Sequence, residues 1–216
     1  MPRLLQSTFI AGPAGRLEAL LEAPDAQVRI TRAAVICHPH PLYGGTMHNK
    51  VVFRLAKAAR RASAAVLRFN FRGVGQSAGN HDEGAGEQDD LRAALGYLSD
   101  RYPGLPLLAA GFSFGARVAL RVACGDPRLE RVVVAGAPVN RGDWSFLRHC
   151  GCAKAFVQST NDEYGERPAL ERIYGSAAGP KSLRWVEARD HFFADALDPF
   201  EDAAFEAFHS ELADGK

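Results

Sequence analysis

The sequence predicts an α/β fold with a mostly parallel sheet of about eight strands and helices on both faces. Short apolar runs rich in branched residues alternate along the chain with longer amphipathic stretches, which is typical of parallel strands joined by helices. The chain has 216 residues, of which 47% are hydrophobic, enough for one sizeable core and too few for two domains. We therefore expect residues 1–216 to form a single domain.

An antiparallel strand pair is expected first, at residues 3–10 and 15–23, because Gly-Pro-Ala-Gly separates two segments of alternating polarity. This pair should form one edge of the sheet. Six buried strands are then expected at residues 33–37, 64–69, 105–110, 131–135, 153–157 and 182–186.

Helical patterns lie between these strands. We expect helices at residues 47–61, 87–101, directly after Ser113, 168–177 and 199–212. The run Glu-Gln-Asp-Asp that opens the second helix suits the positive end of a helix dipole, and we interpret it as a solvated helix start. The glycine-rich segment from Arg72 is expected to be a long surface loop.

The charge balance argues against nucleic acid and membrane partners. Lys and Arg number 26 against 25 Asp and Glu, which leaves a formal charge of +1 and no basic surface for a polyanion. The chain begins with no signal-peptide pattern, and no apolar stretch reaches the roughly 18 residues of a membrane helix. We expect a cytoplasmic protein that acts on a small molecule, and the sequence leaves its oligomeric state open.

The cysteines of the chain are Cys37, Cys124, Cys150 and Cys152. Three of them lie in or beside apolar runs, where a buried thiol behaves as a small hydrophobic group. The Cys150-Gly-Cys152 pair is compatible with a metal site or a redox switch, but no second pair at zinc-ligand spacing accompanies it. We expect reduced structural thiols, and neither a metal nor a cofactor.

The strongest chemical signal is Gly-Phe-Ser-Phe-Gly at residues 111–115, between an expected strand and an expected helix. A nucleophile on such a tight turn needs small residues two positions before and after it, because side chains there would collide with the neighbouring strand or helix. The turn would expose the Ser113 hydroxyl and leave the Phe114 N–H free to stabilise an oxyanion. We predict Ser113 as the nucleophile; the alternative is a chance Gly-Ser-Gly turn that caps the helix.

A serine hydroxyl needs a base that takes its proton and a carboxylate that orients this base. His191 follows the last expected strand, and Asp162 follows the strand at residues 153–157, so both are expected at the carboxyl edge of the sheet together with Ser113. We predict His191 as the base and Asp162 as the acid. Neighbouring carboxylates are alternatives for the acid, with the first the main rival: Glu163, Asp190 and Asp195.

The loop after the strand at residues 33–37 is expected to supply the second oxyanion donor. Because prolines have no N–H, the candidate donors are the backbone N–H groups of Leu42, which we favour, His40 and Tyr43. The histidines of this loop lack a carboxylate at metal-ligand spacing, which argues against a metal site. His38 is better explained as a brace that forms hydrogen bonds to backbone groups.

Four motifs of the chain together resemble the small, lidless serine α/β-hydrolases related to dienelactone hydrolase: H-P-H-P-L-Y-G-G-T-M-H-N-K-V-V, F-N-F-R-G-V-G-Q-S, G-F-S-F-G and D-H-F-F. The resemblance implies an α/β-hydrolase fold and a triad of Ser113, Asp162 and His191. Such enzymes often insert a covering domain where this chain has only the 15 residues 138–152, so no large lid is expected. Dienelactone hydrolases use a cysteine nucleophile, so their lactone chemistry is not carried over.

We expect a serine hydrolase that cleaves a small acyl ester or thioester through an acyl-enzyme intermediate. An ester is favoured over an amide because a shallow site has little means to distort the amide bond. Tyr43, Phe112 and Phe192 are candidates for an apolar substrate pocket, or alternatively for ordinary core packing. The alternatives are a peptidase or amidase, and a binding protein that has the fold without catalysis.

Overall fold

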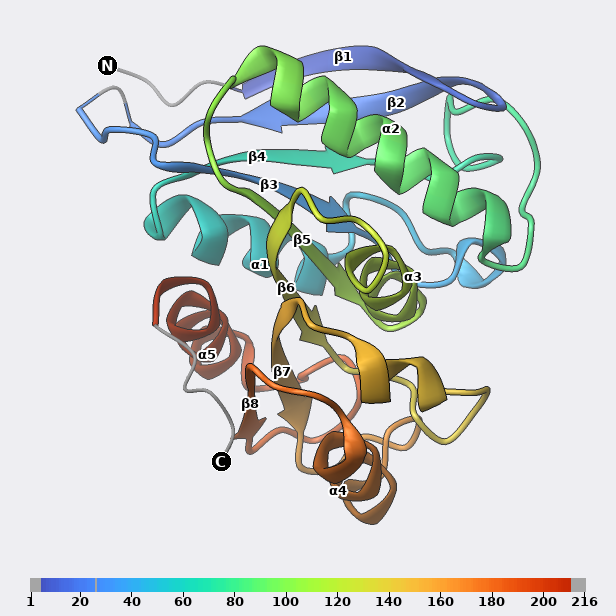
Figure 1. The fold of residues 1–216 in the computed structure, drawn as a ribbon, viewed down its shortest axis with the longest axis vertical. Coiled ribbons are helices and arrows are strands. Elements are labelled where there is room, and N and C mark those ends of the chain that lie inside the picture. The colour runs from blue at the N-terminus through green and yellow to red at the C-terminus, as the bar shows by residue number, and fades with distance from the viewer. Residues whose placement is uncertain (1–4, 26, 211–216) are drawn as a thin grey trace.

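The computed structural model describes residues 5–25 and 27–210, which form one eight-stranded sheet flanked by helices (Figure 1). The strand order is β1-β2-β4-β3-β5-β6-β7-β8; β2 pairs antiparallel with β1 and β4, and all other pairs are parallel. This confirms the predicted fold class. The strands are β1 (Leu5–Gly12), β2 (Gly15–Glu22), β3 (Arg32–Cys37), β4 (Ala64–Phe69), β5 (Leu107–Phe112), β6 (Leu129–Ala135), β7 (Ala153–Ser159) and β8 (Lys181–Val186).

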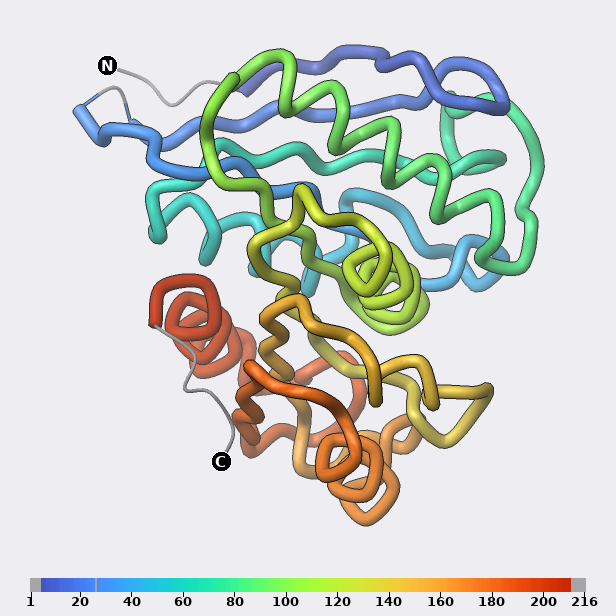
Figure 2. The backbone as a smooth tube through the Cα atoms, in the orientation of Figure 1, coloured from blue at the N-terminus to red at the C-terminus, as the bar shows by residue number. Residues whose placement is uncertain are grey.

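Helices cover both faces of the sheet. One face carries α1 (Lys50–Arg61) and α5 (Leu197–His209), and the other carries α2 (Ala85–Arg101), α3 (Phe114–Ala123) and α4 (Arg167–Ser176). Figure 2 shows the path of the chain, from the blue hairpin of β1 and β2 at one edge to the orange and red segments of β8 and α5 near the other. None of the helices in the described part of the chain combines the length and apolar character that crossing a membrane requires.

The central strands are apolar on both faces because helices cover both. In β5, Leu107 and Ala109 pack toward α2 and α3, whereas Leu108, Ala110 and Phe112 pack toward α1 and α5. All five side chains are buried. This arrangement explains the continuous apolar runs of the sequence, and the parallel order places the carboxyl ends of β3 and β5 to β8 at one edge of the sheet.

Element boundaries differ from the predicted ones where caps decide them. The first helix begins at Lys50 instead of Met47 because the side-chain oxygen of Asn49 accepts hydrogen bonds from Val51 N and Val52 N, at 2.9 and 3.5 Å. The predicted strand start at residues 3–4 and helix end at residues 211–212 lie outside the described residues.

The prediction that residues 182–186 form a buried strand is wrong. The strand exists as β8, but Arg184 is exposed and most of the other side chains are only half-buried. The reason is its place in the sheet, because β8 is the last strand and pairs with β7 alone.

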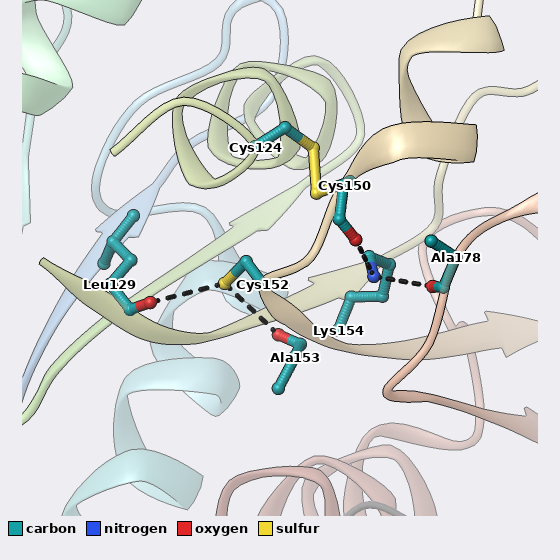
Figure 3. The surroundings of a disulfide bond; sticks show 7 residues. All are labelled: Cys124, Leu129, Cys150, Cys152, Ala153, Lys154 and Ala178. Atoms are coloured by element: carbon teal, nitrogen blue, oxygen red, sulfur yellow. Dashed lines mark hydrogen bonds between the residues drawn. A yellow bond between two sulfur atoms is a disulfide. The ribbon is translucent and has the colours of Figure 1, made fainter. Parts of the chain in front are cut away.

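The prediction of reduced cysteines is also wrong for two of the four. Cys124, directly after α3, forms a disulfide with Cys150, which precedes β7 (Figure 3). The ammonium group of Lys154 donates hydrogen bonds to the carbonyl oxygens of Cys150 and Ala178, both at 2.8 Å, and so links the same segment to the connection between α4 and β8. The disulfide ties the end of α3 to the β6–β7 connection. Cys37 and Cys152 are free thiols, as predicted.

Reduction of the disulfide is expected to lower the free energy of unfolding by about 3 kcal/mol, because the bond closes a loop of 26 residues in the unfolded chain. For a chain of this size, the loss corresponds to a fall in Tm of about 6–12 °C. The measurement is thermal unfolding with and without reductant. The Cys152→Ser variant should respond as the wild type does, and a Cys124→Ser/Cys150→Ser variant should not respond. An unchanged Tm of the reduced wild type would contradict this account.

Candidate active site

Ser113 occupies a strained turn between β5 and α3. Its backbone has φ 57° and ψ −119°, a conformation that a residue with a side chain rarely adopts. The Ser113 N–H donates to the carbonyl oxygen of Ala135 in β6 at 3.0 Å, and the Ser113 carbonyl accepts from Ala116 N in α3 at 2.9 Å. Bonds on both sides thus hold the turn at the carboxyl edge of the sheet, where the Ser113 side chain is half-buried.

The glycines on either side of Ser113 are required by close packing. A Cβ atom on Gly115 would lie 2.5 Å from the carbonyl oxygen of His38 and 2.6 Å from that of Cys37, at the end of β3. A Cβ atom on Gly111 would collide with the Gly115 backbone. The small residues that a tight turn requires on either side of the serine therefore let α3 begin directly against the end of β3.

His191 is buried in the loop between β8 and α5 and is paired with a carboxylate. Its Nδ1 donates to Oδ2 of Asp162 at 2.8 Å. The ring lies 4.8 Å from the rings of both Phe112 and Tyr164, measured between centroids. Gly136 lies against it as well, since a Cβ there would be 2.9 Å from His191 Cε1. These contacts fix the plane and the tautomer of the imidazole.

The Asp162 carboxylate accepts hydrogen bonds at both oxygens in a turn after β7. Oδ1 accepts from Tyr164 N at 2.8 Å and Gly165 N at 3.0 Å, and Oδ2 accepts from His191 and from the side-chain amide of Gln158 at 2.7 Å. Four donors therefore satisfy the hydrogen-bonding capacity of this buried carboxylate. Gln158 could not be assigned from the sequence because the expected strand ended at residue 157, whereas β7 continues to Ser159 and places this amide inside the sheet.

The rival carboxylates bind other groups. Glu163 accepts from the backbone N–H of His191 at 3.1 Å, Asp190 accepts from the N–H groups of Phe192 and Ala194, and Asp195 pairs with Arg189. None of them is recorded in a hydrogen bond to the His191 ring within the described ranges. The structure thus brings together Asp162 and His191 directly. The contacts from Ser113 to this pair are indirect: its neighbour Phe112 packs against the His191 ring, and its N–H bonds to Ala135 in β6, next to Gly136. The assignment of all three residues as a triad stays a prediction.

The loop after β3, which is expected to supply the second oxyanion donor, contains a short 3₁₀ turn, Pro41–Tyr43. The Leu42 N–H, our favoured donor, is engaged in this turn with the His40 side chain at 3.3 Å, and the Tyr43 N–H donates to the His40 carbonyl at 3.1 Å. For the His40 N–H, no acceptor is recorded among the residues that the structure describes. By this criterion the His40 N–H is more available than that of Leu42, and the choice between the two oxyanion donors stays a prediction. The Phe114 N–H belongs to the first turn of α3, where helices leave N–H groups free.

His38 braces this loop as expected. Its Nδ1 bonds to the carbonyl oxygen of Pro39 at 2.7 Å, and its Nε2 accepts from Phe71 N at 3.0 Å. The two bonds join the loop after β3 to the segment after β4. Because the imidazole is fully buried, its pKa is lowered to about 4, so that it is neutral at pH 7.

The three pocket candidates differ in exposure. Tyr43 and Phe192 are 84% and 39% exposed and can contact a ligand, whereas Phe112 is fully buried beneath His191. The interpretation of Phe112 as a pocket residue is wrong, because its position in β5 directs the side chain into the core below the imidazole. It supports the predicted base instead.

The acidic start of α2 is only partly solvated, because Asp89 is exposed whereas Glu87 and Asp90 are buried. Glu87 is fully buried and accepts hydrogen bonds from His81 Nδ1 at 2.7 Å and from the N–H groups of Asp82 and Gly84. Burial raises the pKa of Glu87, but the backbone hydrogen bonds and the His81 imidazole lower it by more. The pKa of Glu87 is therefore below its usual value. This pair folds the 81–84 loop over Phe114, whose ring lies 5.6 Å from His81.

No group of metal-binding side chains occurs in the described part of the chain.

Comparison with known proteins identifies relatives over most of the chain. A family model described as serine aminopeptidase S33 (Hydrolase_4) matches residues 31–172. An uncharacterised protein of Rickettsia prowazekii is 34% identical over 207 residues, which cover 90% of this chain and 85% of that protein.

Solved structures show the same fold. A lidless α/β serine hydrolase from Xanthomonas campestris is 33% identical with a TM-score of 0.86, over 96% of this chain and 94% of that one. An α/β serine hydrolase homologue from Coxiella burnetii is 33% identical with a TM-score of 0.87, over 93% and 96%. An esterase from Pyrococcus furiosus, at 15% identity, has a TM-score of 0.79 over 94% and 92% and shares the fold.

Acidification is expected to weaken the protein through His38. Below about pH 6.5 the unfolded chain binds a proton at this residue, whereas the folded protein binds it only near pH 4, so stability is lost as the pH falls through this window. The loss attributed to His38 is about 3 kcal/mol. Chemical unfolding at pH 7 and pH 4 should therefore show a smaller difference for His38→Gln than for the wild type. His149→Gln, which changes an exposed histidine, is the control and should show the wild-type difference in unfolding free energy between pH 7 and pH 4. If this difference were the same in His38→Gln and in the wild type, the role of His38 would be contradicted.

Proposed function

The chain belongs to the family of lidless α/β serine hydrolases, and from this premise we propose that it is a serine esterase with Ser113 as nucleophile, His191 as general base and Asp162 as the orienting acid. One observation carries the proposal. At the edge where Ser113 stands on its strained turn, a buried imidazole from another loop is held by a buried carboxylate. Such a pair beside a serine is the arrangement that activates a hydroxyl group.

In the proposed mechanism, the Ser113 hydroxyl attacks the carbonyl carbon of the substrate while His191 Nε2 takes the hydroxyl proton. The Asp162 carboxylate, bonded to Nδ1, stabilises the imidazolium that forms. The Phe114 N–H, together with a loop N–H for which His40 is the better candidate, stabilises the negative oxygen of the tetrahedral intermediate. Protonated His191 then gives its proton to the leaving group, and water hydrolyses the acyl-enzyme by the same steps in reverse order.

The proposed substrate is an ester or thioester with a small apolar acyl group. The exposed rings of Tyr43 and Phe192 offer apolar contact on the two loops that border the site. A peptidase is the second candidate, because the matching family model carries that description. It is less favoured since hydrolysis of an amide needs binding energy that distorts the bond, and an open site provides few contacts for this purpose.

The test is a comparison of kcat/KM for p-nitrophenyl butyrate and for aminoacyl p-nitroanilides. We expect turnover of the ester by the wild type and its loss in Ser113→Ala and His191→Ala. Asp162→Asn should lower kcat by roughly 10⁴-fold, because the amide favours the wrong imidazole tautomer. Asp195→Asn, which changes an exposed carboxylate in the same region, should retain the wild-type rate. Preferred cleavage of the anilides would favour the peptidase, and no turnover of either class would contradict a hydrolase.

A further inference from the structure

Gln158 is a polar side chain inside the sheet that the proposed mechanism has not used. It lies near the end of β7, follows the buried Phe156 and Val157, and is itself fully buried. A buried amide is costly unless both its ends form hydrogen bonds. Its presence here therefore calls for a function of the amide group, since an apolar residue would fill the space without that cost.

The hydrogen bonds of Gln158 leave only one orientation of the amide. Its Oε1 accepts from Ala137 N at 2.9 Å, and its Nε2 donates to Asp162 Oδ2 at 2.7 Å and to the carbonyl oxygen of Gly165 at 3.1 Å. A rotation that exchanged oxygen and nitrogen would place donor against donor at Ala137 and acceptor against acceptor at Asp162. The amide must therefore present an N–H to the carboxylate.

The surroundings of Gln158 are shaped to admit this contact. A Cβ atom on Gly165 would collide with the Gln158 amide nitrogen and with the Ala137 carbonyl, so the turn after Asp162 closes over the amide only with glycine there. Ala137 directly follows Gly136, which packs against the His191 ring. The amide thus joins the segment that supports the imidazole to the turn that carries the acid.

We propose that Gln158 is a positioning residue of the active site, whose amide N–H holds Asp162 in the rotamer in which Oδ2 faces His191. This inference rests on the proposed function, and it adds a residue that acts through Asp162 without contacting the substrate. Oδ2 receives both the Gln158 and the His191 hydrogen, whereas the backbone N–H groups of the turn hold only Oδ1. Loss of the amide donor leaves Oδ2 bound to His191 alone, so that the carboxylate is held less firmly in the position that stabilises the charged imidazole in the transition state.

The first variant is Gln158→Met, which keeps the length of the side chain and removes its hydrogen bonds. We expect kcat for the ester to fall about 10- to 100-fold, because a hydrogen bond to a charged group of this kind is lost, while KM changes less than about threefold. Gln6→Glu, on the exposed edge strand β1, controls for a change at a distant glutamine and should have the wild-type rate.

The decisive variant is Gln158→Glu, because its carboxyl group donates only while protonated. Burial and the charge of Asp162 raise the pKa of the introduced group. At lower pH its proton replaces the amide N–H, and at higher pH two carboxylates face each other and the added charge holds a proton on His191. The ionisable groups near the introduced carboxyl are Asp162, which contacts residue 158, and His191, which is bonded to Asp162. Glu163 lies beyond them and accepts a hydrogen bond from the backbone N–H of His191.

The proposal therefore predicts a bell-shaped dependence of kcat/KM on pH for Gln158→Glu, a rise to a plateau for the wild type, and a uniformly lowered curve for Gln158→Met. A wild-type curve for both variants would overturn it. The proposal would also be overturned if both variants gave curves of wild-type shape whose activity fell only in proportion to the folded fraction measured by circular dichroism. This result would mean that Gln158 serves only to stabilise the fold.

A second readout separates this proposal from the proposed function. The proton between His191 Nδ1 and Asp162 should give a downfield ¹H NMR signal in the wild type that is lost or shifted in Gln158→Met and assigned by its absence in His191→Ala. If the wild type hydrolyses no ester but this signal depends on Gln158, the proposed function fails and the positioning role stands. If esters are hydrolysed and the signal is the same in folded Gln158→Met, the positioning role fails.

Discussion

The close packing of α3 against the end of β3 is the constraint on which the rest of the site depends. Gly115 leaves no room for a side chain between the helix and the carbonyl groups of Cys37 and His38. As a result the chain turns sharply at Ser113, with positive φ, and the first N–H groups of α3 lie next to the loop after β3. One steric requirement thus brings the proposed nucleophile and the proposed oxyanion donors together.

The parallel order of the sheet brings the remaining groups to the same edge. Asp162 and His191 follow β7 and β8, which lie beyond β6 as seen from the serine. These features could be predicted from the sequence because they depend on local patterns and on chain order. Apolar runs indicate buried strands, glycines two residues either side of a serine indicate the turn, and loops after successive parallel strands meet at one edge.

The features that could not be predicted depend on which residues meet in space. The partner of Glu87 is His81 in the preceding loop, and the partner of Cys124 is 26 residues away. Whether Leu42 or His40 has a free N–H is decided by a 3₁₀ turn that periodicity does not reveal. Exposure of β8 follows from its edge position, which depends on the strand order of the whole sheet and not on a local pattern.

Reaction with a fluorophosphonate tests most directly whether Ser113 is the activated nucleophile that we propose. Such probes form a covalent bond to a serine hydroxyl only where a base removes its proton. Mass spectrometry of the digested wild-type protein should find a single adduct, on the peptide that contains Ser113, and no adduct in His191→Ala. A folded wild-type protein that stays unlabelled, or that is labelled at another residue, would contradict the account.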